Sequence, residues 1–180
     1  MIKNILQDNY VDTMASNNRN DGSGLGNYEL RFTNAGQAIG EARRRNRLND
    51  WPIIVEGPRD RRALIALGFT GPIEVLNRGW TIERVVAYLY ESYGTRNDKV
   101  GGASVCLLMD WDRTGGRLQK EFRERLISLD RPIDESLRKT LSIVLTPESR
   151  VVEALYKMAD LLKPIIDVHD RDGADEPLLP

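Results

Sequence analysis

The sequence predicts an α/β fold: a parallel sheet of about four strands flanked by helices, with a helical C-terminal extension. The prediction rests on apolar runs at residues 52–56, 73–76 and 105–109. Apart from Glu56 at the end of the first run, the first and third runs are continuously apolar, which is typical of strands buried on both faces of a parallel sheet. A helical pattern follows each run, and this alternation indicates strand–helix units with parallel strands.

Each of the three helices has a recognisable boundary. Pro58 suits the first turn of the first helix, and Gly68 suits its end. Thr81 is a good N-cap for the second helix. Gly115 and Gly116 open the third, in which leucine and phenylalanine recur at helical spacing as far as residue 129.

The chain beyond the third helix is predicted to be mainly helical. Residues 134–145 fit a helix, although residues 142–145 alone would also suit a fourth strand. A C-terminal helix is expected over residues 146–165. Residues 146–148 (Thr-Pro-Glu) resemble a helix start, and Pro164 is expected to end it.

The two ends of the chain differ in composition from its centre. Residues 1–32 are expected to form a flexible segment, because much of this stretch is Asn, Ser, Gly and Asp. Residues 33–50 form a helical lead-in. Residues 166–180 are predicted to be a frayed acidic tail. The central α/β domain therefore occupies residues 51–145.

The composition excludes several classes of protein. A length of 180 residues suits one domain. A single cysteine, Cys106, excludes disulfide scaffolds and cysteine-rich zinc sites, and its place within a strand makes it a core residue. A single histidine, His169, gives little support to a catalytic triad. With no run of eighteen apolar residues and no secretory signal, we expect a cytoplasmic protein without a membrane segment.

The net charge of −1 hides an uneven distribution. Residues 1–42 carry −2 and residues 164–180 carry −4, so residues 43–163 carry +5. Twenty of the 26 basic residues are arginine, which binds phosphate in planar, bidentate contacts. Charge alone leaves a phosphate-binding face and an ordinary solvated surface equally open.

Three acids fall where open α/β sheets keep their sites, at the carboxyl ends of strands. Glu56 ends the first strand, Asp110 ends the third, and Asp112 follows two residues later. Converging carboxylates need a cation, and oxygen ligands favour Mg²⁺, with Mn²⁺ as the alternative. Singly, Glu56 and Asp112 could instead be acids of a helix N-terminus. Together, the three favour a metal site.

The surroundings of these acids suit a phosphodiester substrate. Gly57, Gly115 and Gly116 allow close backbone approach at the same edge. Several arginines flank the acids, and arginines beside a metal-binding group favour bound phosphate. They are Arg59, Arg61, Arg62, Arg78, Arg113 and Arg117.

The two acidic motifs resemble those of the Toprim domain, which topoisomerases, bacterial-type primases and small nucleases share. The first motif is a strand ending in Glu-Gly, here Glu56-Gly57, with Asp60 three residues beyond the glycine. The second is Asp-x-Asp-x-x-Gly, here residues 110–115 (Asp-Trp-Asp-Arg-Thr-Gly). The resemblance covers residues 52 to about 130, and the second motif is most similar to that of small stand-alone archaeal Toprim proteins.

The resemblance implies a compact Rossmann-like fold and a role for each acid. Asp110 and Asp112 would hold Mg²⁺, and Glu56 would act as general acid or base or as a further ligand. Two positions depart from the family pattern. Pro58 stands where lysine is common, and Gly116 stands where topoisomerases carry another glutamate.

The chain is too short for a topoisomerase gate, and one cysteine cannot build a primase zinc module. The leading hypothesis is therefore a small metal-dependent Toprim nuclease acting on RNA or DNA, with Arg59, Arg78, Arg113 and Arg117 binding phosphates. The alternative is a nucleic-acid-binding or partner-recruiting module that cleaves slowly or not at all. Either protein could bind a protein partner through its N-terminal segment or acidic tail.

Overall fold

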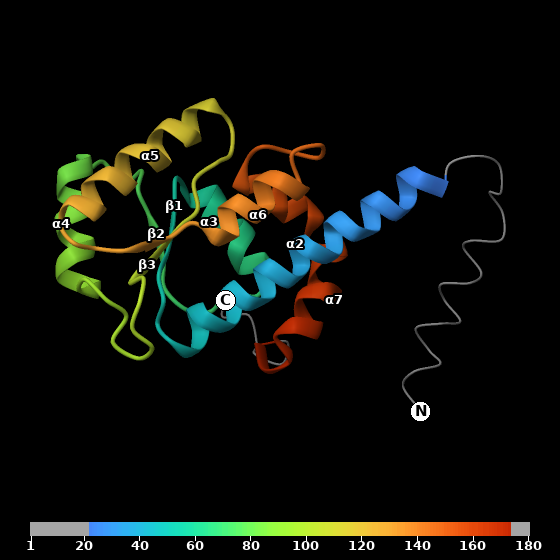
Figure 1. Ribbon diagram of the computed structural model, residues 1–180, viewed down its shortest axis with the longest axis horizontal. Coiled ribbons are helices and arrows are strands. Elements are labelled where there is room, and N and C mark those ends of the chain that lie inside the picture. The colour runs from blue at the N-terminus through green and yellow to red at the C-terminus, as the bar shows by residue number, and fades with distance from the viewer. Residues whose placement is uncertain (1–21, 174–180) are drawn as a thin grey trace. The chain divides into compact units, whose positions relative to one another are not determined.

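A computed structural model of the chain describes residues 22–173 (Figure 1). It separates into two units, Met1–Leu30 and Arg31–Pro180. Of the first unit, only residues 22–30 are described, and they are helical as the beginning of α2 (Gly22–Leu48). The sheet and the candidate site belong to the second unit.

The sheet has four parallel strands: β1 (Ile53–Val55), β2 (Ile73–Val75), β3 (Val105–Leu107) and β4 (Ile133–Asp134). Their order across the sheet is β2-β1-β3-β4. In register, Ile53 lies between Ile73 of β2 and Cys106 of β3. The predicted α/β fold with a parallel sheet is confirmed. Its fourth strand is β4, and not residues 142–145, which the sequence offered as a possible fourth strand.

The sheet separates two hydrophobic cores, because alternate strand residues point to opposite faces. Ile53 and Cys106 face one core, which α2, α3, α6 and α7 cover. Ile54 and Leu107 face the other, beneath α4 and α5. Figure 1 shows the sheet between these two groups of helices. Cys106 is fully buried, as expected of a core residue, and burial raises the pKa of its thiol.

The three helices predicted after β1, β2 and β3 are present. They are α3 (Pro58–Ala66), α4 (Ile82–Tyr93) and α5 (Arg113–Ser128). Thr81 caps α4 by accepting a hydrogen bond from the backbone N–H of Arg84. Gly68 follows α3 with a φ of 88°, a conformation that glycine adopts without strain. Among residues 22–173, no helix is long and apolar enough to cross a membrane.

The C-terminal part is helical, as predicted, but its elements differ from the expected ones. Residues 136–144 form α6 (Ser136–Val144). Of the two structures that the sequence left open for this segment, the helix is therefore the one that forms. Residues 146–148 form a turn, followed by the 3₁₀ helix η1 (Val152–Met158) and α7 (Ala159–His169). Pro164 does not end α7, because buried Leu162 and Ile166 hold the helix against the core on either side of it.

Two expectations about the chain ends were wrong in part. Helix α2 starts at Gly22, inside the segment expected to be flexible. At the other end, Asp170 is 3% exposed and is followed by η2 (Arg171–Gly173). Residues 1–21 and 174–180, which hold the rest of the predicted flexible segment and acidic tail, lie outside the described residues.

A buried arginine explains why Asp170 is ordered. Arg43 of α2 is fully buried, and its Nε donates to Asp170 Oδ2 at 2.8 Å. Its Nη1 donates to Asp167 Oδ1 at 2.8 Å and to the carbonyl of Leu67. Arg47 also pairs with Asp170 at 2.5 Å. This network joins α2, the end of α3 and the end of α7.

We expect Asp170→Asn to destabilise the protein by about 3 kcal/mol, because it leaves a buried guanidinium without its main counter-charge. Urea denaturation monitored by circular dichroism measures this loss. Asp172→Asn is the matched control, since Asp172 lies two residues further on and is exposed, and it should change stability by less than about 0.5 kcal/mol. Equal stability of the two variants would contradict a structural role for the buried pair.

Candidate functional site

Glu56 and Asp110 meet at the carboxyl ends of neighbouring strands. Glu56 follows β1 and Asp110 lies just beyond β3, and these two strands pair directly. Strand β2 is added on one side of β1, whereas β3 and β4 are added on the other side. The order of the strands therefore changes direction between β1 and β3. Such a switch point is where open α/β sheets bind ligands. The backbone N–H of Asp110 donates to Glu56 Oε1 at 2.9 Å, so the two acids predicted from separate motifs are in contact.

The C-terminal part of the chain also contacts Asp110. The N–H of Val152, at the start of η1, donates to Asp110 Oδ1 at 2.7 Å. Arg138 of α6 donates to the carbonyls of Met109 and Asp110 at 3.0 and 2.8 Å. Sequence reasoning missed Arg138 and Val152, because nothing in the amphipathic pattern of α6 or the apolar pattern of η1 sets them apart from their neighbours.

The predicted close approach of backbone at the site holds for one glycine. A Cβ placed on Gly115 would lie 2.2 Å from the carbonyl oxygen of Asp110. A Cβ on Gly116 would come no closer than 3.8 Å to Arg138, and one on Gly57 no closer than 3.7 Å to Asp60. Gly115 therefore lets α5 start against the end of β3, whereas Gly57 and Gly116 are not needed for space.

Asp112 acts as the N-cap of α5. Its Oδ1 accepts a hydrogen bond from the N–H of Gly115 at 2.7 Å, which is the helix-terminus role that the sequence left open for it. Asp60 has a similar role in α3, where it accepts from the N–H of Gly57 at 2.8 Å. Among residues 22–173, no group of three or more acid, His or Cys side chains is arranged to hold a metal ion. The expected metal-sized cluster of Glu56, Asp110 and Asp112 is therefore not formed.

The acids nevertheless lie close enough to perturb one another. Burial, and then the charges of Glu56, Asp60 and Asp112, raise the pKa of Asp110 to about 6. Burial also raises the pKa of Glu56, and the charges of Asp60 and Asp112 add to that shift. Burial lowers the pKa of the Arg138 guanidinium, which faces the same acids. The site thus concentrates negative charge that the neighbouring arginine only partly offsets.

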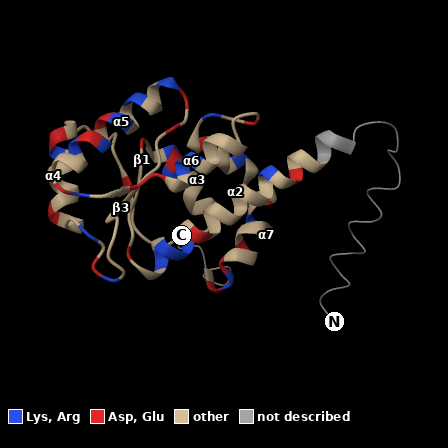
Figure 2. Cartoon of the chain, in the orientation of Figure 1, with Lys and Arg blue, Asp and Glu red and all other residues tan. Residues whose placement is uncertain are grey.

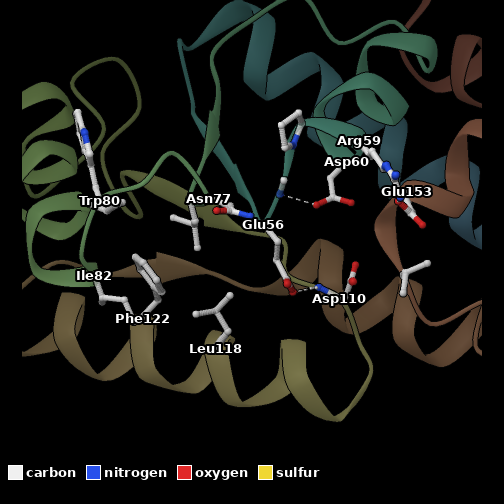
Figure 3. A pocket seen from close by; sticks show the side chains of 15 residues that line it. Glu56, Arg59, Asp60, Asn77, Trp80, Ile82, Asp110, Leu118, Phe122 and Glu153 are labelled. Atoms are coloured by element: carbon white, nitrogen blue, oxygen red, sulfur yellow. Dashed lines mark hydrogen bonds and ion pairs between the residues drawn. The ribbon is translucent and has the colours of Figure 1, made fainter.

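A pocket of about 770 Å³ opens beside Glu56 and Asp110. Figure 3 shows the two acids near the middle of the pocket. Trp80, Ile82 and Phe122 lie towards one end, and Arg59 and Glu153 lie towards the other (Figure 3). The pocket therefore joins an acidic centre to an apolar end between α4 and α5, and to a charged end beside η1.

The four arginines predicted to bind phosphate fall into two groups. Arg59, Arg113 and Arg117 are exposed near the acids, and Figure 2 shows basic and acidic residues interspersed along α5. Arg59 has only a long contact, 3.6 Å, with Glu153. Arg78 instead pairs with Glu74 and donates to the carbonyl of Val75, so its guanidinium is already engaged within the protein.

The two tryptophans near the site have different surroundings. Trp111 packs against the larger core, and its Nε1–H donates to the carbonyl of Ser149 at 2.8 Å. It therefore anchors the loop before η1. Trp80 lines the pocket, where the guanidinium of Arg84 lies 4.3 Å from the centre of its ring.

Fold and site together define an α/β protein with an acidic site at the switch point of a parallel sheet. No family model matches the chain. It is 32% identical over 117 residues to a UPF0292 protein of Thermococcus onnurineus, covering 65% of this chain and 80% of that protein. A UPF0292 protein of Pyrococcus abyssi is 31% identical over 109 residues, covering 61% and 74%. The chain belongs to the UPF0292 family.

One solved structure, of a protein from Aquifex aeolicus, is also similar. It is 26% identical in sequence, with a TM-score of 0.49, and the match covers 64% of this chain and 93% of that one.

The two neighbouring glycines of α5 provide a matched pair of variants. Gly115→Ala should destabilise the protein by about 2 kcal/mol, because its methyl group would overlap the carbonyl of Asp110. Gly116→Ala should be neutral or stabilise by up to about 1 kcal/mol, since alanine is the better helix former and the space is open. Denaturant unfolding measures both. Equal effects at the two positions would mean that α5 does not press on β3 at Gly115.

The raised pKa of Asp110 predicts that the free energy of unfolding falls as pH rises. A carboxyl whose pKa is raised by folding keeps its proton better in the folded state, so stability is lost as pH rises from about 4 to about 6. Asp110→Asn keeps an oxygen for the Val152 N–H and cannot ionise. At pH 7 in EDTA it should be more stable than wild type by about 1 kcal/mol, after allowing for solvent screening.

Melting curves of both proteins between pH 4 and pH 7 test this expectation. Near pH 4 the difference in melting temperature should vanish, which makes that measurement the internal control. A wild-type protein that gains stability relative to Asp110→Asn as pH rises would contradict the raised pKa.

Proposed function

We propose that this protein carries out Mg²⁺-dependent phosphodiester hydrolysis on nucleic acid, as a small Toprim nuclease. The observation that carries the proposal is the contact of Glu56 with Asp110 at the junction of β1 and β3, inside a pocket that ends in exposed arginine. Two acids from separate motifs meet where this fold type binds ligands. Their shared negative charge favours a cation, and the cation in turn favours a phosphate.

The donor atoms fit a magnesium ion by their chemistry. Among the described residues, one oxygen each of Glu56, Asp110 and Asp112 accepts a backbone N–H, and the second oxygen has no hydrogen bond. Mg²⁺ in phosphate-handling sites commonly binds one or two carboxylates and keeps several waters, so a three-acid cage is not required. Asp110 and Asp112 would hold the ion, which would leave the second oxygen of Glu56 free to act as a base, and the bound ion would polarise a scissile phosphate.

The chain's own residues would supply the remaining steps. Arg59, Arg113 and Arg117 would contact phosphate oxygens and orient the backbone of the nucleic acid. Glu56, whose pKa is raised, would take a proton from the attacking water. The water oxygen would form a bond to phosphorus as the bond from phosphorus to the leaving oxygen breaks. The leaving oxygen would take up a proton from solvent, and Glu56 would release its proton to solvent. Arg138 would act as a positioning residue by holding the backbone of Asp110.

A second candidate function has its own supporting observation. Asp112 uses a carboxylate oxygen to cap α5, and the described acids form no three-membered metal group. A site with this arrangement would also suit a module that binds nucleic acid without cutting it, or cuts it slowly. The two candidates share the arginines and differ in what Glu56 does.

The test compares wild type with Glu56→Gln on a panel of labelled single- and double-stranded RNA and DNA. With Mg²⁺, wild type should cleave at least one substrate, and EDTA should abolish the reaction. Glu56→Gln keeps an oxygen for the N–H of Asp110 but cannot exchange a proton at neutral pH, so cleavage should fall about 100-fold or more with little change in affinity. Equal cleavage by both proteins would exclude Glu56 as the acid or base.

Binding is tested separately with arginine variants. Arg113→Ala combined with Arg117→Ala should weaken binding and lower the slope of log Kd against log salt by about 2. Arg44→Ala combined with Arg96→Ala is the charge-matched control, because both arginines are exposed, one on α2 and one in the loop that leads into β3, away from the start of α5. Binding without any cleavage by wild type would favour the module. No binding at any salt concentration would reject both candidates.

A further inference from the structure

The pocket as a whole is larger than a phosphate site needs. A volume of about 770 Å³ lies within the range of pockets that enclose whole organic ligands. Beyond the acids, the lining comes from the β2–α4 loop, α4 and α5, and apart from Asn77 its side chains are apolar or aromatic. These residues are Leu76, Trp80, Ile82, Val85, Leu118 and Phe122.

Trp80 has several side-chain contacts at this end of the pocket. Its ring packs edge-on against Tyr88, with centroids 5.6 Å apart and planes at 76°. The guanidinium groups of Arg84 and Arg78 lie 4.3 and 5.1 Å from the centre of its ring, within the distance of a cation–π contact. Arg78 is itself fixed by its ion pair with Glu74.

Two of the side chains that contact Trp80, Arg78 and Tyr88, are themselves bound to Glu74. Glu74 accepts hydrogen bonds from the hydroxyls of Tyr88 and Tyr93 at 2.8 and 2.7 Å. These bonds and the ion pair with Arg78 hold the pKa of Glu74 below its usual value, although burial opposes them. Glu74 thus fixes Arg78 and Tyr88, and both of these side chains contact the ring of Trp80. A ligand that stacked on Trp80 would therefore meet a ring already in place.

We infer that this end of the pocket holds one unpaired nucleobase of a single-stranded nucleic acid. The inference rests on the proposed function and specifies its substrate. A base is flat and apolar on its faces, which matches Trp80 and Leu118, and the pocket is continuous with the acids where the adjoining phosphate would sit. Exposed Asn77 lines the pocket between the two parts and offers an amide to the base edge. A base within a duplex is stacked and paired, so it could enter only after being extruded.

Two variants test the base pocket in different ways. Trp80→Ala removes the stacking surface, and Leu118→Trp fills the space where the base would lie. Both are made in the Glu56→Gln background to suppress cleavage, and Glu56→Gln alone serves as the parent protein for comparison. Binding of a short single-stranded oligonucleotide is followed by fluorescence anisotropy, alongside a duplex of the same sequence and a free mononucleotide.

We expect each variant to weaken single-strand binding about tenfold, the usual scale for losing one base–aromatic stack. Trp80→Phe should restore most of that loss. Tyr90→Ala is the matched control, because Tyr90 is an exposed aromatic on α4 outside the pocket lining. The parent should bind the single strand at least tenfold more tightly than the duplex, and the mononucleotide should show the same dependence on Trp80 at lower affinity.

The outcomes separate this inference from the proposed function. If wild type cleaves with Mg²⁺ but the pocket variants, confirmed as folded by melting, bind single strands as the parent does, the base pocket is wrong and the nuclease proposal stands. Equal losses for single strand and duplex would also reject the base pocket. If the parent binds no nucleic acid in any form, the proposed function fails and this inference fails with it.

Discussion

Asp110 is the residue on which the geometry of the site depends. Its N–H donates to Glu56 from β1, and its carboxylate accepts the N–H of Val152 from η1. Its carbonyl accepts from Arg138 of α6 and lies where only a glycine at position 115 leaves room for α5. One residue at the end of β3 thus joins a strand, two α-helices and the 3₁₀ helix. The pocket takes its shape from these four attachments.

The same contacts create an electrostatic tension. Backbone N–H groups favour the ionised forms of Glu56 and Asp110, whereas burial and neighbouring acids raise both pKa values, that of Asp110 to about 6. Proteins accept such a cost at sites that act on ligands more often than at structural positions. A bound cation or a proton would reduce the repulsion between the carboxylates of Glu56 and Asp110. The proposed hydrolysis uses both.

The segment after residue 129 contributes contacts that hold the site in place. Val152 and Arg138 fix Asp110, and Trp111 anchors the loop before η1. The buried pair of Arg43 and Asp170 then ties the end of α7 to α2 and to the end of α3. Stability of the C-terminal helices and geometry of the acids are therefore linked through one continuous core. An α/β protein with so small a sheet uses its helices to hold its functional edge.

The sequence by itself determined the first three strands, the helices between them, and the meeting of Glu56 with Asp110, because apolar runs and strand ends can be read from neighbouring residues. It did not determine the position of β4, which is only two residues long. Tertiary structure alone decided that Asp112 caps α5, that Arg78 is engaged by Glu74, and that α7 continues through Pro164. These outcomes depend on which partners lie within a few ångströms after folding. Residue type and spacing do not contain that information, since an aspartate after a strand suits a metal and a helix cap equally well.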